Sequence, residues 1–382
     1  MSDKHIHIIS FTIPYPPNYG GAIDVFYKIV ALHSSGIKVH LHCFSYDRKP
    51  SPELEKYCYE VYYYPRKTGL LSALTWKPYI VYSRRSDCLL KNLLKDDHPI
   101  IFEGLHCCYY LSHPSLLNRV KIYRESNIEH LYYYHLSKAE TNIRKKVYYI
   151  LSSLKLRAFQ RTLSYATLML TVSKEDNEYL TKKFSDIPIE YLPSFHKDDE
   201  VKSLPGKGDF ALYQGNLGVA ENEKAAKYLI RNIFKESDIR LVIAGLNPSR
   251  SLKQLVNENS KITLVANPSE MEMAQLISTA QVNILVTFQP TGLKLKLLNA
   301  LFNGRYCLVN QGMLFGTELS DLCEIGIDTE DLKQKIKSLM QTPFKEDQIE
   351  HRKDKLMYLH SNKENCIRLL NLLSLFSTRA AF

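Results

Sequence analysis

The chain has 382 residues, of which 45% are hydrophobic and 24% are charged. This length corresponds to two domains of ordinary size, and the composition excludes a disordered or fibrous chain. No apolar run reaches the roughly 18–20 residues that span a bilayer, and the charged start MSDKHIHIISF does not have the pattern of a secretory signal peptide. Eight cysteines without a Cys-x-x-Cys pair predict free thiols in a reducing cytoplasm.

The net charge of +10 is concentrated in the first half of the chain. Residues 1–195 contain 26 Lys and Arg against 18 Asp and Glu, and they hold 22 of the 26 tyrosines. A basic surface attracts the phosphates of nucleic acids, anionic lipids or phosphorylated substrates, and tyrosine is frequent at bilayer interfaces. We therefore expect two domains with different partners, an anionic membrane surface being a partner of the first. Tyrosine used only as a core filler is the alternative.

The first half alternates strand-like and helical segments. A buried strand is predicted at 5–12, a helix over 22–35 that ends at Gly36, and a second strand at 38–44. This βαβ opening predicts a parallel sheet with helices on both faces. Further elements are predicted as strands at 61–64, 100–103, 120–124 and 167–172, and as a long polar helix over 136–165.

The second half repeats the alternation after a polar, proline-bounded segment, 188–205, which we interpret as a linker. Strands are predicted at 210–214, 240–244, 262–265, 282–286 and 306–309, and helices at 221–235, 249–258, 269–279 and 293–303. The tail from about 347 to 376 is predicted to be helical. The pattern favours an α/β chain made of two doubly wound parallel-sheet domains.

Two glycine-containing loops follow the first predicted strand of each domain. Gly20 and Gly21 lie between the first strand and the first helix, and Gly215, Asn216 and Gly218 follow the strand at 210–214. Glycines let a backbone approach a ligand closely, and a helix N-terminus supplies N–H donors for an anion. Ligands of open α/β sheets bind at the carboxyl ends of strands, so we expect both loops to bind a ligand. A simple turn is the alternative for the first loop.

A third glycine, Gly292, precedes a predicted helix whose first turn holds Leu293, Lys294 and Lys296. Cations are disfavoured in a first turn unless an anion is bound there, so the two lysines indicate a phosphate site. Asn299 lies three residues after Lys296, on the same helix face, where its amide would bind a ribose hydroxyl. A solvated lysine face on an amphipathic helix is the alternative.

Four motifs occur in order along the chain. They are Pro14-Tyr-Pro-Pro-Asn-Tyr-Gly-Gly-Ala22, Thr171-Val-Ser-Lys-Glu-Asp176, Tyr213-Gln-Gly-Asn-Leu217 and Gly292-Leu-Lys-Leu-Lys-Leu-Leu-Asn-Ala-Leu-Phe-Asn-Gly304. Together they resemble the retaining glycosyltransferases of the GT-B fold, family 4, over essentially the whole chain. The resemblance implies two Rossmann-like domains that face a central cleft: 1–196 on the acceptor side, with a C-terminal helix at about 357–382 packed back on it, and 206–356 on the nucleotide-sugar side.

The resemblance also implies an activity: transfer of a sugar, with retention, from a nucleotide-diphosphate donor to a hydroxyl of a glycan or lipid-linked glycan, in surface-polysaccharide synthesis. Electrostatic stabilisation of the departing diphosphate would be the main catalytic effect, without a metal or other cofactor. The expected free thiols, the missing signal pattern and the basic, tyrosine-rich first half predict a cytoplasmic protein, peripheral at the inner face of the plasma membrane. The donor-binding residues would be Gly20, Gly21, Gly215, Asn216, Gly292, Leu293, Lys294, Lys296 and Asn299. Glu103, Asn127 and Glu129 are the candidate catalytic contacts to sugar or acceptor.

The chain departs from the family pattern at four positions. Thr291 and Asn299 stand where the family commonly has two glutamates, and Asn216 and Glu221 stand where many members have an Arg and a Lys. A non-catalytic relative that acts as a binding or scaffolding subunit is therefore the alternative function. Outside the family, the nearest rival is a nucleotide-sugar epimerase with two similar domains.

Four histidines alternate along two predicted strands. His5 and His7 share one strand face, and His40 and His42 share another. A metal would need further converging ligands, so we interpret these side chains as packed or surface histidines.

Two further clusters are set aside on chemical grounds. Cys107 and Cys108 have no recognisable catalytic partner, and adjacent cysteines form only strained disulfides. The Tyr- and Lys-rich segments 62–67 and 132–146 resemble a stacking surface for single strands, but no nucleic-acid-binding motif accompanies them. We therefore expect no nucleic-acid partner.

Overall fold

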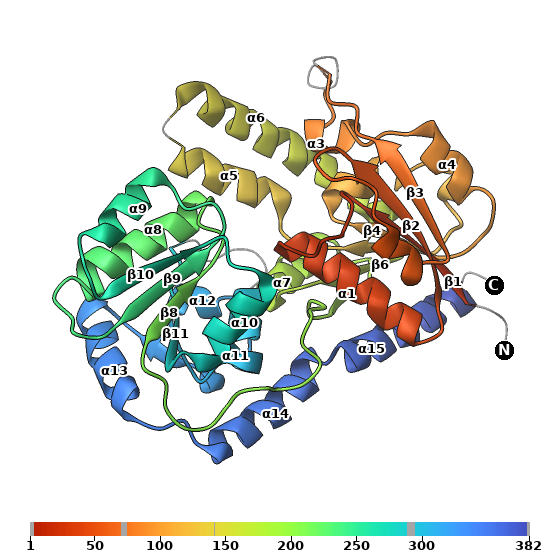
Figure 1. Cartoon of the computed structure of the whole chain (residues 1–382). Helices are drawn as coiled ribbons and strands as arrows, with labels where there is room; N and C mark the ends of the chain where they lie inside the picture. The colour runs from red at the N-terminus through yellow and green to blue at the C-terminus, as the bar shows by residue number, and fades with distance from the viewer. Residues whose placement is uncertain (1–3, 70–74, 141, 289–294, 380–382) are drawn as a thin grey trace. The chain divides into compact units, whose positions relative to one another are not determined.

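A computed structural model of the chain describes residues 4–69, 75–140, 142–288 and 295–379 (Figure 1). The chain forms two compact units. Unit 1 comprises Met1–Lys197 with His360–Phe382, and unit 2 comprises Asp198–Leu359. The C-terminal segment thus returns to the unit that contains the N-terminus.

Unit 1 is built on a seven-stranded, fully parallel sheet of order β3-β2-β1-β4-β5-β6-β7. Its strands are β1 (His5–Ser10), β2 (Lys38–Ser45), β3 (Glu60–Pro65), β4 (Ile100–Glu103), β5 (Lys121–Arg124), β6 (Leu168–Thr171) and β7 (Ile189–Tyr191). The chain builds outward from β1 in one direction and then, from β4 on, in the other. The crevice between β1 and β4 is therefore the topological switch point where such sheets bind ligands.

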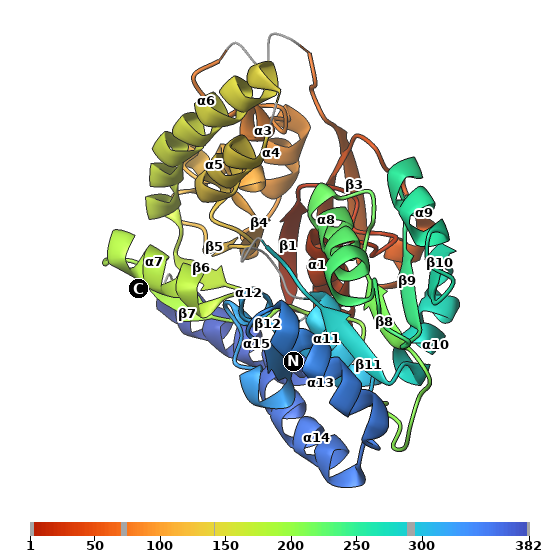
Figure 2. The ribbon, with the colours of Figure 1, turned by 90° about the vertical axis from the view of Figure 1, so that its left-hand side faces the viewer.

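Helices cover both faces of this sheet (Figures 1 and 2). They are α1 (Gly20–Ser34), α3 (Tyr79–Tyr82), α4 (Asp87–Leu93), α5 (Glu129–Ala139), α6 (Ile143–Phe159), α7 (Lys174–Lys183) and α15 (Asn362–Arg379), with shorter turns η1 (Pro52–Lys56), η2 (Leu105–Tyr110), η3 (Pro114–Leu116) and η4 (Gln160–Tyr165). One face packs on α1 and α15 through residues such as Ile29 and Leu369, and the other packs on α4, α6 and α7 through residues such as Leu89, Leu156 and Leu180.

Unit 2 repeats the plan with six parallel strands in the order β10-β9-β8-β11-β12-β13. They are β8 (Ala211–Gln214), β9 (Leu241–Gly245), β10 (Ile262–Ala266), β11 (Val282–Leu285), β12 (Tyr306–Asn310) and β13 (Glu324–Gly326). Its helices are α8 (Ala220–Tyr228), α9 (Arg250–Asn257), α10 (Glu270–Thr279), α11 (Leu295–Asn303), α12 (Gln311–Leu314), α13 (Thr329–Gln341) and α14 (Glu346–His360), with η5 (Leu229–Ile233) and η6 (Ser320–Leu322). The switch point of this sheet lies between β8 and β11.

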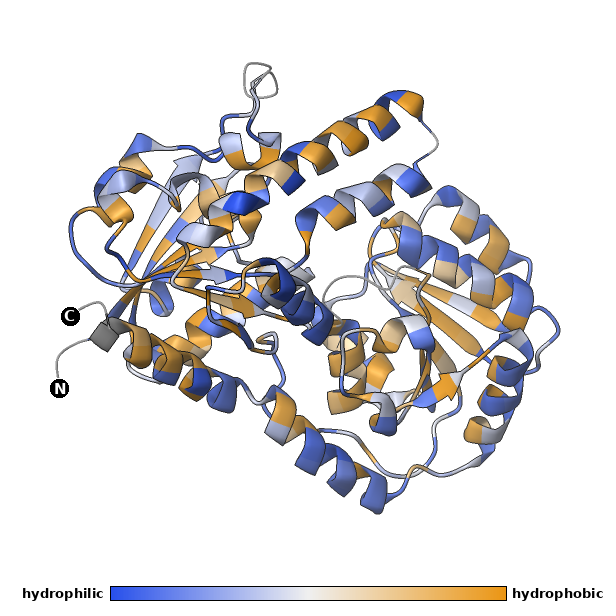
Figure 3. Ribbon diagram, turned by 180° about the vertical axis from the view of Figure 1, so that it is seen from behind, coloured by the Kyte–Doolittle hydropathy of each residue, from blue (hydrophilic) through white to orange (hydrophobic). Residues whose placement is uncertain are grey.

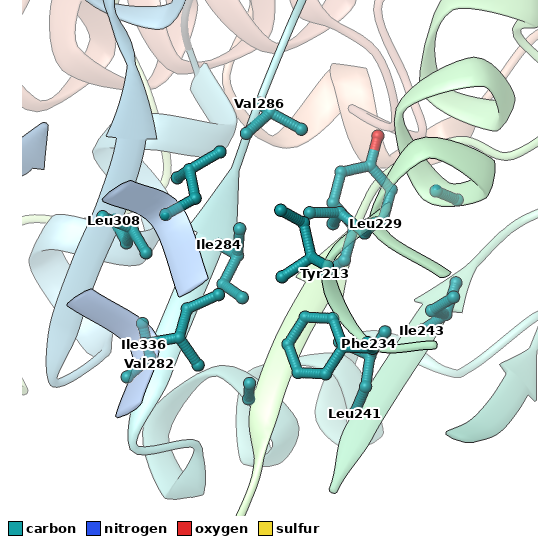
Figure 4. Close-up of a cluster of buried hydrophobic side chains, with 14 of the residues drawn as sticks. Tyr213, Leu229, Phe234, Leu241, Ile243, Val282, Ile284, Val286, Leu308 and Ile336 are labelled. Atoms are coloured by element: carbon teal, nitrogen blue, oxygen red, sulfur yellow. The ribbon is translucent and has the colours of Figure 1, made fainter. Parts of the chain in front are cut away.

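The core of unit 2 explains why β8 and β11 are central strands. Side chains of Tyr213, Ile243 and Ile284 point from neighbouring strands into one apolar cluster, which Leu229 and Phe234 close from the helical layer (Figure 4). Continuous burial of this kind is typical of parallel strands that are covered on both faces. It fixes where β8 and β11 end, and thus where the loops after them begin.

The alternation of strands and helices predicted a doubly wound fold in both halves, and this is confirmed. Two details of the prediction were wrong. The segment 136–165 is not one helix, because Asn142 caps a new helix by accepting hydrogen bonds from the N–H groups of Arg144 and Lys145. The segment 188–205 is not wholly a linker, because it contains the short edge strand β7.

Gly36 ends α1 as predicted, with a φ of 76° that a side chain would strain. Gly20 and Gly21, expected in the loop before this helix, are instead its first two residues. Within the described residues, no helix is both long and apolar enough to cross a membrane.

Candidate functional site

The loop after β8 packs tightly against its neighbours. A Cβ added to Gly215 would lie 3.2 Å from Cγ of Asn222, and one added to Gly245 would lie 1.8 Å from the carbonyl oxygen of Gly215. Only a glycine at position 245 therefore allows the two strand ends to approach each other this closely, whereas a side chain at position 215 would require Asn222 to shift slightly. The side-chain oxygen of Asn216 accepts a hydrogen bond from the N–H of Gly218 at 3.1 Å, which fixes the turn into α8.

Asn222, in the first turn of α8, connects this loop to α11. Its Nδ2 donates to the carbonyl oxygen of Asn216 at 3.0 Å, and its Oδ1 accepts from Nζ of Lys296 at 3.2 Å. The hydroxyl of Tyr213 donates to the backbone carbonyl of Asn222 at 2.9 Å. The glycine loop, the start of α8 and the start of α11 are thus held together at the carboxyl end of β8.

Lys296 supplies a positive charge at the carboxyl end of β8. Its Nζ lies 5.7 Å from the centre of the Tyr213 ring. Burial lowers the pKa of Lys296 from 10.5 to about 8, and the carboxylate of Glu221 opposes that shift. A partly desolvated ammonium group gains more from a bound anion than an exposed one does, so this lysine is suited to hold a phosphate.

Glu221, in the first turn of α8, places a carboxylate at the end of the neighbouring strand β11. Its Oε1 accepts from the hydroxyl of Thr287 at 2.9 Å and from the N–H of Phe288 at 2.6 Å. Backbone N–H groups at a strand end are the kind of donors that bind phosphate oxygens. The Glu221 carboxylate occupies one such N–H, that of Phe288, together with the Thr287 hydroxyl. It does so at a position where many members of the resembled family have a lysine.

Asn299 lies one turn beyond Lys296 on α11, as expected. The Oδ1 of Asn299 accepts a hydrogen bond from Nδ2 of Asn303 at 2.9 Å. The same Nδ2 of Asn303 also donates to Oδ1 of Asp198 at 2.9 Å. The described contacts of Asn299 therefore run along its own helix and away from Lys296. Gly292, Leu293 and Lys294 fall outside the described residues.

In unit 1, Glu103 ends β4 and is buried in a charge network. Nζ of Lys28 lies 2.7 Å from Oε1 of Glu103 and 3.1 Å from Oδ2 of Asp24, which also pairs with Arg124. Burial raises the pKa of Glu103 although Lys28 opposes it. Burial also opposes ionisation of Asp24, but Arg124 and Lys28 outweigh it and lower its pKa. This network ties α1 to the sheet, and Glu103 is one of its members.

Glu129, the first residue of α5, belongs to a second buried cluster. Its Oε1 lies 3.7 Å from Nδ1 of His106, a nitrogen without a hydrogen-bond partner among the described side chains. Burial raises the pKa of Glu129 from 4.5 to about 8, against the charge of Arg84. Burial, together with Arg84, lowers the pKa of His106 well below its ordinary value. A protonated carboxyl group beside a neutral imidazole is an arrangement able to exchange a proton with a hydroxyl group.

Gly21 belongs to the same neighbourhood. A Cβ on Gly21 would lie 2.5 Å from Cζ of Phe11, and the Phe11 ring lies 5.3 Å from the His106 ring, centre to centre. Nε of Arg84 donates to the carbonyl oxygen of Phe11 at 2.8 Å. The start of α1, the end of β1 and the Glu129 cluster are therefore contiguous at the switch point of unit 1.

The backbone of Asn127 is held by a third buried carboxyl group of unit 1, that of Glu125. The backbone N–H of Asn127 donates to Oε1 of Glu125 at 3.0 Å, and the Tyr123 hydroxyl donates to Oε2 at 2.7 Å. Burial raises the pKa of Glu125 well above its ordinary range. The side chain of Asn127 is half-buried, and its backbone is fixed at the carboxyl end of β5.

The structure thus brings together some of the predicted residues and separates others. Gly215, Asn216 and Lys296 converge in unit 2, whereas Glu103 and Glu129 belong to different networks of unit 1. Sequence reasoning missed the roles of Arg84 and His106, although it considered Cys107 and Cys108, the two cysteines that follow His106. Both of those cysteines are buried, and burial raises the pKa of each thiol, so neither is a reactive thiolate.

No family model matches the chain. One curated relative, described as an uncharacterized 44.6 kDa protein in the cps region of Klebsiella pneumoniae, is 27% identical over 319 residues, which are 78% of this chain and 80% of the relative. Among solved structures, the sucrose-phosphate synthase of Thermosynechococcus elongatus is similar with a TM-score of 0.71 and 15% identity, over 98% of this chain and 100% of that one.

Two further solved structures are similar over almost their whole length. Anabaena Alr3699/HepE, solved with UDP and glucose, has a TM-score of 0.66 at 10% identity, over 97% of this chain and 99% of that one. The trehalose-phosphate synthase of Burkholderia xenovorans, a UDP-forming enzyme solved with glucose-6-phosphate, has a TM-score of 0.63 at 10% identity, over 97% of this chain and 100% of that one. The chain therefore has the GT-B fold of these proteins, as predicted.

Proposed function

We propose that this protein is a retaining glycosyltransferase of the family 4 type, which transfers a sugar from a nucleotide-diphosphate donor to a hydroxyl of a glycan or lipid-linked glycan. The observation that carries this proposal is Lys296, partly buried and hydrogen-bonded through Asn222 to the glycine loop after β8. It lies at a strand end where open α/β sheets bind their ligands. The fold is that of a sucrose-phosphate synthase and of Anabaena HepE, which was solved with UDP and glucose.

The donor diphosphate would bind to unit 2. Lys296 would pair with a phosphate oxygen, and Gly215 and Asn216 would let the backbone approach the nucleotide. Departure of the nucleoside diphosphate develops negative charge, and a fixed cation in a partly desolvated site stabilises that charge. Asn299 would bind a ribose hydroxyl after exchanging its contact with Asn303. Gly20, Gly21, Gly292, Leu293 and Lys294 are assigned to the donor by the motifs alone.

The acceptor side of the reaction is assigned to unit 1. Glu129, with its pKa near 8, and the neutral His106 beside it would contact the attacking hydroxyl, next to the backbone of Gly20 and Gly21. Asn127 would contact the sugar. Glu103, whose carboxylate is paired with Lys28, would act as a positioning residue that fixes α1.

The proposal is tested in two steps. Nucleoside diphosphates and their sugar conjugates are first screened for a rise in melting temperature, because a ligand of the native state stabilises it by mass action. The stabilising sugar nucleotide is then supplied with glycan acceptors, and transfer is measured. Binding without transfer or hydrolysis would favour the scaffolding alternative, and failure of every nucleotide to bind would contradict the proposed transferase.

The cellular setting belongs to the same proposal. We assign the protein to surface-polysaccharide synthesis at the cytoplasmic face of the membrane, and the cps region of the Klebsiella pneumoniae relative supports this setting.

A basic, apolar helix of unit 1 supports membrane contact. Exposed apolar side chains recur along α6 at helical spacing, which Figure 3 shows as a run of hydrophobic residues: Ile143, Val147, Ile150, Leu151 and Leu154.

The charge of α6 complements anionic lipids. Residues 143–165 contain six Lys and Arg and neither Asp nor Glu. Arg144, Lys145, Arg157 and Arg161 are exposed. A helix that combines exposed apolar residues with basic ones lies in the interfacial plane of a bilayer and prefers anionic headgroups. We call the five apolar residues the α6 stripe and propose that it contacts the membrane on which a lipid-linked acceptor is carried.

A further inference from the structure

Five histidines gather at the amino ends of the first strands of unit 1. Two come from β1 and two from β2, where His7 is in register with His40, and the fifth lies in the short loop before β4. They are His5, His7, His40, His42 and His98. This edge of the sheet is opposite the carboxyl ends that carry Glu103 and Glu129, so the proposed sugar-transfer chemistry makes no use of it.

Three of these side chains converge on one point. A ring nitrogen of His5, one of His40 and one of His98 all lie within 4.8 Å of one another. Nδ1 of His5 is 2.8 Å from Nε2 of His40. The rings of His5 and His98 are stacked with centres 4.7 Å apart, so one of these two rings has to turn for both in-plane lone pairs to face a shared ion. Three imidazoles that converge in this way are a donor set for a divalent transition metal.

A carboxylate orients the central ligand. Oε2 of Glu60, on β3, lies 2.8 Å from Nδ1 of His40. Because the carboxylate can only accept, Nδ1 of His40 carries the proton, and the lone pair on Nε2 points toward His5. In zinc sites, a ligating histidine commonly donates its other ring N–H to a carboxylate in this way, which fixes the orientation of the ring.

The loop that carries His98 is fixed by Asp96 and Arg119. Oδ1 of Asp96 accepts from the N–H of His98 at 2.9 Å and pairs with Nη2 of Arg119 at 3.2 Å. Nε of Arg119 donates to the carbonyl oxygen of His98 at 3.1 Å. The backbone that carries the third ligand is therefore held in place before any metal arrives, and a preorganised loop costs less entropy on binding.

The remaining two histidines belong to a separate hydrogen-bonded chain. His7 lies 2.9 Å from Oδ1 of Asp96 through Nε2 and 2.8 Å from His42 through Nδ1, and Nδ1 of His42 lies 2.9 Å from the Tyr64 hydroxyl. Both rings thus have partners at both nitrogens. The His7 ring also stacks on the His40 ring, with centres 4.7 Å apart, so this pair packs against the converging histidines.

We propose that His5, His40 and His98 bind one Zn²⁺ ion, with water in the fourth position and Glu60 as the outer carboxylate. The proton on Nδ1 of His5 would move to its Nε2, so the ion is bound by three neutral imidazoles. The ion joins β1, β2 and the loop before β4. It therefore stabilises unit 1 and leaves the proposed donor site unchanged.

The test uses the full chain after treatment with a chelator. Calorimetric titration with Zn²⁺ is expected to show one equivalent bound and a melting temperature that rises with the metal. Co²⁺ should give the intense visible absorption of a four-coordinate ion. His98→Gln is expected to abolish stoichiometric binding, and Glu60→Gln should weaken it by about 10–100-fold, as losses of outer-shell carboxylates do.

The matched control is His135→Gln, which changes an exposed histidine on α5 and should bind like the wild type. Metal-free melting curves of each variant show whether it folds. Wild-type chain that binds no Zn²⁺, or a folded His98→Gln that binds it unchanged, would overturn the proposal. If nucleotide binding fails while Zn²⁺ binding persists, only the proposed function is lost.

Discussion

The carboxyl edges of the two sheets follow one plan but differ in the groups that they bury. In unit 1 the edge buries carboxyl groups, and burial raises the pKa of Glu103, Glu125 and Glu129. In unit 2 the edge partly buries an ammonium group, and burial lowers the pKa of Lys296. Desolvation favours the neutral form in both cases, so the same physical cause acts on groups of opposite charge.

The difference indicates different partners for the two edges. A lysine whose charge is poorly solvated gains most from a bound anion, as a diphosphate would be. A carboxyl group with a pKa of about 8, as Glu129 has, repels an anion less and can donate a hydrogen bond or exchange a proton with a hydroxyl. Variants that remove one buried group at a time separate these roles.

The largest effect is expected from Glu129→Gln on stability. The folded-state pKa of Glu129, about 8, lies above its ordinary value of 4.5. The folded protein then binds the proton more tightly than the unfolded chain does. The resulting contribution to the free energy of unfolding is complete below pH 4.5 and is lost as the pH rises to 8. At about 1.4 kcal/mol for each unit, the wild type should lose a few kcal/mol over this range.

Glu129→Gln should remove much of that loss. The free energy of unfolding, measured by calorimetry at pH 5 and at pH 9, should change less in the variant than in the wild type. Glu346→Gln, at the first position of α14 in unit 2, is the control and should keep the wild-type dependence. An identical pH dependence in Glu129→Gln and the wild type would show that Glu129 ionises normally in unit 1.

Lys296→Met should weaken the binding of nucleoside diphosphates by about tenfold or more, since a charge-assisted hydrogen bond contributes about 1.5–3 kcal/mol. Wild-type affinity should also fall above pH 8, where the lysine loses its proton. Lys296→Arg should remove that pH dependence because its guanidinium stays charged.

Calorimetry measures all three affinities, and Lys253→Met, at an exposed lysine on α9, serves as the control. Equal affinities in Lys296→Met and wild type would remove the lysine from the donor site and end the contrast between the two edges.

Much of the fold could be predicted because doubly wound domains alternate long buried strands with helices. The strands that were missed, β7 and β13, have three residues each and are partly exposed, so they show no periodicity. The helix break at Asn142 depends on one capping side chain. Such features depend on local or tertiary contacts that a hydrophobic pattern does not contain.

The site was predictable only where a motif is continuous in sequence. The glycine loop after β8 and Lys296 could be found because each belongs to a strand–loop–helix pattern. The cluster of Arg84, His106 and Glu129 assembles from three separate segments, so spacing could not reveal it. For the same reason His98, which supplies the third converging imidazole, could not be connected with His5 and His40.

A smaller effect is expected from Asn299→Glu, which restores the family's usual carboxylate in unit 2. Asn299 shares the amide of Asn303 with Asp198, so the new charge would face an existing one. Turnover should stay unchanged or fall a few-fold. A fall of that size corresponds to a loss of about 1 kcal/mol of transition-state stabilisation. If the wild type shows no sugar transfer but the variant does, the native chain is instead a non-catalytic scaffolding subunit.

The smallest effect concerns the membrane, and it extends the comparison to the outer surfaces of the two units. Leu151 and Leu154 of the α6 stripe are 54% and 58% exposed. Burying each in the headgroup region would contribute about 1–2 kcal/mol, and each nearby basic residue about 1 kcal/mol. Leu151→Glu should therefore reduce sedimentation of the protein with anionic vesicles at low salt, and high salt should reduce binding of the wild type.

Leu117→Glu is the matched control, because Leu117 is 53% exposed but lies outside α6. It should bind vesicles as the wild type does, since the same charge is introduced away from the stripe. If both variants lose binding equally, net charge alone governs attachment and the stripe has no part in it. If the wild type does not bind at low salt, the acceptor is taken from solution, and the apolar face of α6 has another partner.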